Sequence, residues 1–115
     1  MIRVLEVLAT LKRAGAETLV DSLVRRLDPN RFEPAIATLY DRTANEYDPP
    51  VRVWRLGKRR GLDVCMYSRL REVMDEFQPD IVHTHSYVMR YTLPVTRCKQ
   101  VHTVHNLATK EVDWP

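Results

Sequence analysis

Two kinds of hydrophobic spacing alternate along this chain, and their order limits the folds open to it. The stretch from Ile2 to Leu8 is nearly continuous in apolar residues, which is typical of a strand covered on both faces. From about Ala16 to Leu27 the apolar residues recur every three or four positions, which predicts an amphipathic helix. Strands that alternate with helices pair in parallel through right-handed crossovers. We therefore expect an α/β fold, a parallel sheet with helices on both faces.

The same alternation continues along the rest of the chain. Further strands are expected at 32–40, 51–56, 80–85 and 101–104, and further helices at 62–77 and 86–93. The strand at 51–56 alternates polar with apolar residues, which indicates an edge position with one wet face. Met66 and Met74 fall on the apolar face of the helix at 62–77 and are expected in the core.

Composition narrows the class of protein. The 115 residues allow one domain at most, and 44% hydrophobic residues indicate an ordinary globular chain. A net charge of +3 suits an anionic ligand such as a phosphate, but no basic stripe with interleaved aromatic residues predicts nucleic-acid binding. Cys65 and Cys98 favour two reduced thiols in a cytosolic protein, with a bridge between them as the alternative. Glu6 interrupts the first apolar run, so neither a signal peptide nor a membrane span is expected.

Ligands of a parallel sheet bind beyond the carboxyl ends of its strands, which makes three segments candidates for chemistry. In the first, residues 12–17, Gly15 lets the backbone approach a ligand and the helix N-terminus suits a phosphate. A plain tight turn is the alternative there. The other two segments end the strands at 80–85 and 101–104. They hold all four histidines of the chain, which are His83, His85, His102 and His105.

Three interpretations of these histidines stay open. Imidazoles suit proton transfer or hydrogen bonds to sugar hydroxyls and phosphates, and residues 83 and 85 point to one face of their strand. The H-x-H spacing also fits a metal-dependent hydrolase, but a catalytic metal site usually includes a carboxylate. Asp80 begins its strand at the wrong end, and Glu111 and Asp113 lie in the tail, so no metal is expected. The third interpretation is structural histidines that cap strand ends.

Four segments together resemble one known family. They are Arg13–Glu17, Leu56–Asp63, Gln78–His85 and Val101–Asn106. Their order and content are similar to the N-terminal, acceptor-side domain of retaining GT-B glycosyltransferases. This family 4-like group includes phosphatidylinositol mannosyltransferase-like and sucrose synthase-like enzymes. The resemblance covers essentially the whole chain, and Pro79–His85 is its most specific part. It implies a Rossmann-like domain that takes part in sugar transfer.

The resemblance also implies roles for single residues. The histidine that matches His85 lies beside the donor sugar in relatives and is implicated in catalysis, and His83 stands next to it. A glycine pair after the first strand lies near the donor diphosphate in relatives. Here Ala14 replaces the first glycine and Gly15 keeps the second. His105 matches a position that contacts the donor sugar.

Further implications concern the acceptor, the domains and the partners. Glu17 and Asn106 are expected nearer the acceptor, and no metal or other cofactor is expected. Because relatives bind the nucleotide in a C-terminal domain, residues 1–115 are expected to be an incomplete N-terminal domain that is inactive alone. The expected partners are a nucleotide-sugar donor and a sugar, lipid-linked or small-molecule acceptor, in the cytoplasm or peripherally at the inner face of the membrane. A shortened domain would also expose apolar surface that favours dimerisation. The alternative function is a stand-alone α/β module that binds a phosphorylated ligand without catalysis.

Overall fold

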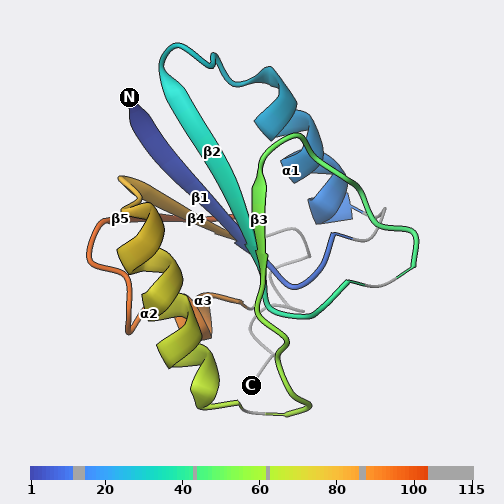
Figure 1. Cartoon of the computed structure of the whole chain (residues 1–115), viewed down its shortest axis with the longest axis vertical. Coiled ribbons are helices and arrows are strands. Elements are labelled where there is room, and N and C mark those ends of the chain that lie inside the picture. Colours follow the sequence, from blue (N-terminus) through green and yellow to red (C-terminus); the bar gives the residue numbers. More distant parts are fainter. Residues whose placement is uncertain (12–14, 43, 62, 86–87, 104–115) are drawn as a thin grey trace.

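The structure, a computed structural model, describes residues 1–11, 15–42, 44–61, 63–85 and 88–103. Its strands are β1 (Ile2–Leu8), β2 (Phe32–Thr38), β3 (Arg52–Arg55), β4 (Ile81–His85) and β5 (Lys99–Thr103), and its helices are α1 (Gly15–Arg26), α2 (Cys65–Phe77) and α3 (Met89–Thr92). The strands form one sheet in the order β3-β2-β1-β4-β5, with every neighbouring pair parallel (Figure 1). The expected Rossmann-like α/β fold is therefore confirmed.

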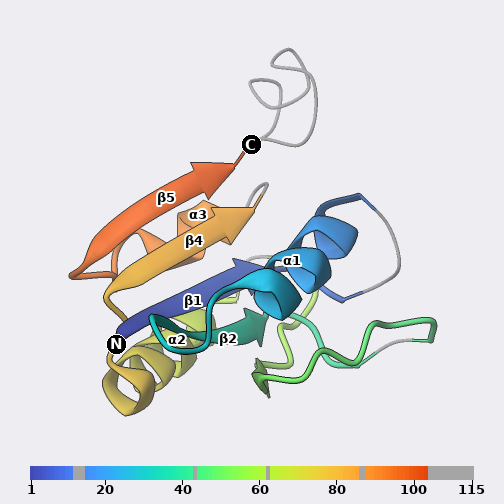
Figure 2. The same cartoon turned by 90° about the horizontal axis from the view of Figure 1, so that it is seen from above.

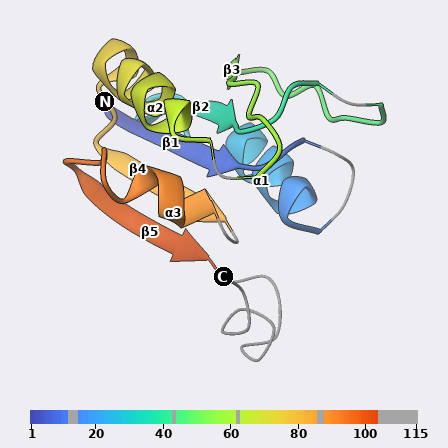
Figure 3. The same ribbon diagram turned by 90° about the horizontal axis from the view of Figure 1, so that it is seen from below.

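Helices cover both faces of the sheet, as predicted. Figure 2 shows α1 in front of the sheet, and Figure 3, from the opposite direction, shows α2 and α3 in front. On its face α1 buries Val20 and Val24 against Leu8 and Ile36. Neighbouring side chains of a strand point to opposite faces, so the odd-numbered residues of β1 are left for the α2 face.

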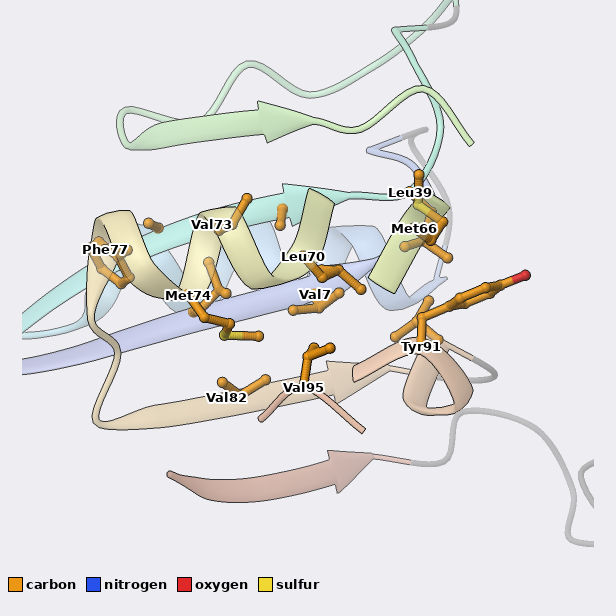
Figure 4. Packing of buried hydrophobic residues seen from close by; sticks show 14 residues of the cluster. Val7, Leu39, Met66, Leu70, Val73, Met74, Phe77, Val82, Tyr91 and Val95 are labelled. Carbon is orange, nitrogen blue, oxygen red and sulfur yellow. The ribbon is translucent and has the colours of Figure 1, made fainter. Parts of the chain in front are cut away.

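The larger part of the core lies between the sheet and α2. Figure 4 shows Leu70 and Met74 of α2 directed at the sheet, close to Val7 and Val82. Met66 has no exposed surface and Met74 is 9% exposed, so both methionines are core residues as expected. Burying a side chain of this size stabilises the fold by about 1.5–3 kcal/mol, so this face supplies much of the driving force for folding.

Several element boundaries differ from the sequence-based prediction, among them the helix expected at 86–93, which spans only Met89–Thr92, and two of the differences have a visible cause. Helix α2 begins at Cys65 and not at residue 62, because the Asp63 side chain holds the preceding turn. Asp63 Oδ1 accepts the Cys65 N–H at 3.0 Å, and Oδ2 accepts the Arg59 N–H at 2.9 Å. Strand β5 begins at Lys99 and not at residue 101, because Lys99 pairs in register with Ile81 of β4. Tertiary pairing thus extends the strand through residues that look polar in sequence.

The contacts of Asp63 also make a prediction for stability. The pKa of the Asp63 carboxyl is held below its ordinary value, mainly by the hydrogen bond from the Arg59 N–H. Burial acts in the opposite direction and raises this pKa, whereas the Cys65 N–H and the positive charge of Arg69 lower it further. A lowered folded-state pKa contributes stability above the unfolded pKa, and this contribution is lost as the pH falls through the folded pKa. We expect Asp63→Asn to lower the free energy of unfolding at about pH 7 and to lose most of this effect by about pH 2.

Urea unfolding of both proteins across this pH range measures the difference. A gap between wild type and Asp63→Asn that stays constant with pH would contradict the assignment. Such a constant gap would mean that the two hydrogen bonds matter and the ionisation of the carboxyl does not.

Candidate active site at the carboxyl end of the sheet

The chain leaves β1 and β4 toward opposite faces of the sheet. Strand β1 leads to α1 on one face, and β4 leads to α3, whose Tyr91 packs in the core on the other face. These two strands are neighbours, so the connection changes sides between them. In open parallel sheets this is the point where ligands bind, beyond the carboxyl ends of the strands. Figure 2 shows the strand arrowheads and the beginning of α1 at the same end of the molecule.

Glu6 is the residue that brings the histidines of β4 together at this point. It lies opposite His83 in the parallel register of β1 and β4. Glu6 Oε1 is 2.8 Å from His85 Nε2 and 3.0 Å from His83 Nδ1. The two imidazole rings lie 4.1 Å apart between their centroids. The expectation that both histidines point to one face is confirmed, and the expectation that no carboxylate stands near them is wrong.

Burial defines the electrostatics of this cluster. Glu6 is fully buried and His85 is 1% exposed, whereas the side chain of His83 keeps 16% of its surface. Burial alone raises the pKa of the Glu6 carboxyl, but the hydrogen bonds and charge interactions with His83 and His85 outweigh it and lower that pKa. The ionised carboxylate can only accept hydrogen bonds. Each facing imidazole nitrogen therefore carries a hydrogen, which fixes the tautomer of a neutral ring.

Strand β5 adds a second layer of contacts. Thr103 Oγ1 lies 2.6 Å from His83 Nε2, the ring nitrogen that faces away from Glu6. Because His83 donates to Glu6 through Nδ1, its Nε2 accepts the Thr103 hydroxyl when the ring is neutral. His102 takes no part in this cluster: its Nδ1 lies 2.9 Å from Thr84 Oγ1, and both residues occupy alternate positions that point to the other face.

Of the remaining predicted site residues, Gly15 and Glu17 are among the described residues and the others are not. Gly15 is the first residue of α1, and Glu17 lies in its first turn. Ala14, His105 and Asn106 lie outside the described residues. Asp80 stands at the opposite end of the sheet, as expected from its place before β4, where its carboxylate accepts the Arg3 N–H at 2.8 Å.

Sequence reasoning missed Glu6 and Thr103. The signal for Glu6 was present, because a carboxylate inside a run of buried strand residues needs a partner. Thr103 carries no such signal, since a threonine in a strand is common and its partner lies 20 residues away in the chain.

A hollow of about 400 Å³ opens far from this cluster, at the other end of α2. It is lined by Arg71, Met74, Asp75, Gln78, Pro79, Val95, Arg97 and Cys98. None of the predicted site residues lines it. Within the described ranges, no helix combines the length and apolar character needed to cross a bilayer.

Comparison with known proteins places the chain in a family. The family described as Glycosyltransferase Family 4 matches residues 13–114. The match includes both β4 histidines and begins after Glu6, so the residue that joins the histidines lies outside it. No match to the chain was found among curated proteins or among solved structures.

Proposed function

The chain belongs to glycosyltransferase family 4, and we propose that it forms the N-terminal, acceptor-side half of a retaining enzyme of the GT-B type. This enzyme moves a sugar from a nucleotide-sugar donor to an acceptor with retention of configuration. The observation that carries the proposal is the cluster of Glu6, His83 and His85 at the point where the β1 and β4 connections diverge. Imidazoles held there suit hydrogen bonds to a sugar and proton transfer at its reacting end.

Glu6 acts in this proposal through the two histidines. His85 is the residue beside the donor sugar, with His83 next to it, and Glu6 is a positioning residue that fixes ring orientation and tautomer. A carboxylate on a central strand is well suited to orienting the rings, because the strand cannot shift without breaking its backbone hydrogen bonds to the neighbouring strands. The same contacts direct His83 Nδ1 and His85 Nε2 at Glu6, and Thr103 holds the opposite nitrogen of the His83 ring.

The first turn of α1 supplies the proposed phosphate side of the site. The backbone N–H groups at a helix N-terminus and the helix dipole favour a diphosphate there, near Ala14 and Gly15. His105 is the proposed second contact to the donor sugar. Glu17 and Asn106 are proposed to lie nearer the acceptor. These assignments rest on the family resemblance and on the position of α1 after β1.

The nucleotide is proposed to bind mainly to a second, C-terminal domain, as in the family that the chain resembles. The acceptor is a sugar, a lipid-linked molecule or another small molecule. For a lipid-linked acceptor the enzyme would work in the cytoplasm at the inner face of the membrane. Under this proposal residues 1–115 contribute half of the active site and transfer no sugar by themselves.

Three measurements test this function. Purified residues 1–115 are expected to give no sugar transfer with nucleotide-sugar donors, because half of the donor contacts are missing. The coding frame beyond Pro115 is expected to encode a second domain. In the family that the chain resembles, this domain carries two glutamates about seven residues apart and a helix N-terminus that suits a phosphate. NMR of the product formed by the complete enzyme is expected to show the anomeric configuration of the donor.

Either of two outcomes would overturn the proposal. Efficient transfer by residues 1–115 alone would refute the division of the site between domains. An inverted anomer in the product would refute the retaining mechanism.

A further inference from the structure

We propose that Glu6, His83 and His85 form a binding site for one zinc ion. Their ligand atoms, one carboxylate oxygen and two imidazole nitrogens, all lie within 4.8 Å of one another. Two histidines and one carboxylate are a donor set that zinc uses in proteins, with a fourth position left open. This proposal goes beyond sugar transfer and does not depend on it.

The distances show that a metal can replace the hydrogen bonds with little movement. Zinc binds these ligands at about 2.0–2.2 Å, which puts neighbouring tetrahedral ligand atoms about 3.4 Å apart. Glu6 Oε1 is now 2.8 Å from His85 Nε2 and 3.0 Å from His83 Nδ1. Glu6 Oε1 therefore needs to move roughly half an ångström away from each imidazole nitrogen, and the two nitrogens, now within 4.8 Å of each other, need to reach the same spacing.

Thr103 is the second observation that indicates a metal site. A histidine that binds a metal usually hydrogen-bonds an oxygen through its other ring nitrogen, which orients the ring. Thr103 Oγ1 stands 2.6 Å from His83 Nε2 and is such an oxygen. When Nδ1 binds the ion, the hydrogen moves to Nε2 and is donated to Thr103. The heavy atoms stay in place because the hydroxyl can reverse its role.

Charge and exposure agree with a zinc ion. One carboxylate and two neutral imidazoles carry a charge of −1, so a divalent ion leaves +1 in place of a buried negative charge. His83 is the most exposed ligand, with 16% of its side-chain surface open, and its side is the route of entry.

The site shares its histidines with the proposed catalytic cluster, which sets its functional meaning. Zinc bound to His83 Nδ1 and His85 Nε2 would replace the hydrogen bonds by which Glu6 orients both rings, so zinc is expected to inhibit transfer in the complete enzyme. Binding and inhibition are separate measurements. Zinc binding without any sugar transfer would support this inference and contradict only the function proposed above.

The direct test is titration of the purified, chelator-treated 115-residue chain with zinc, followed by calorimetry and thermal unfolding. We expect one equivalent to bind and to raise the unfolding temperature, because the ion binds the folded state. His83→Ala is expected to lose this equivalent. Thr103→Val, which removes only the supporting hydroxyl, is expected to weaken binding by about 10–100-fold.

His102→Ala is the matched control, since it removes a histidine from the same pair of strands but from the other face. It is expected to keep the full equivalent. Both cysteines are present in every variant, so zinc bound by thiols would survive His83→Ala and would overturn the proposal. Failure of the folded wild-type chain to bind zinc would overturn it as well, and circular dichroism of each protein establishes that it is folded.

Discussion

Replacement of His85 by glutamine is expected to lower kcat for sugar transfer by about 10²–10⁴-fold in the complete enzyme, the range typical of a group that transfers a proton. In the wild type, His85 Nε2 lies 2.8 Å from Glu6 Oε1 and donates a hydrogen bond to it. Glutamine reaches about as far as histidine, and its amide N–H can donate to Glu6 Oε1 instead. The substitution thus keeps the buried hydrogen bond and removes the imidazole. Activity and stability should separate, with kcat falling far more than the unfolding temperature.

Steady-state kinetics with a nucleotide-sugar donor measure this effect, with the unfolding temperature recorded for the same samples. His102→Ala serves as the control, because His102 bonds Thr84 on the opposite side of the sheet and is expected to change kcat by less than about threefold. Equal losses in His85→Gln and His102→Ala would contradict the assignment. Full activity in His85→Gln would show that the histidine is structural.

Removal of the Glu6 carboxylate is expected to produce the largest change in stability. Glu6→Ala leaves two imidazole N–H groups without an acceptor in a buried site and creates a cavity. Breaking a buried polar pair of this kind costs about 3 kcal/mol. The free energy of unfolding of a domain of this size is about 5–15 kcal/mol, so the loss is a substantial fraction of its stability. Urea unfolding at neutral pH measures it.

Two further variants make this result specific. Glu33→Gln, on the neighbouring strand, removes a carboxylate that is 53% exposed and 3.9 Å from Arg3, so it is expected to change stability by less than about 0.5 kcal/mol. A double-mutant cycle between Glu6→Gln and His83→Gln should show coupling of about 0.5–3 kcal/mol, as residues in one network do. Additive effects in this cycle would contradict the contact between Glu6 and His83.

The sequence by itself determined the helices and strands and indicated the carboxyl edge of the sheet as the candidate site. The spacing of apolar residues is a local property, because each strand or helix must bury its own face, so β1 and α1 were predicted within one residue. The order of strands and helices was enough to expect a parallel sheet. The turn before α2 has a local contact as well, since Asp63 accepts the N–H of Arg59 four residues earlier.

Only the tertiary structure decided which side chains meet. Glu6 and His83 are 77 residues apart, and their contact depends on β1 lying beside β4 in one register. A shift of that register by one residue would turn Glu6 away from both histidines, because successive side chains of a strand point to opposite faces. Local periodicity cannot specify a neighbouring strand or its register. Glu6 therefore looked like an interruption in an apolar strand until the fold placed it between His83 and His85.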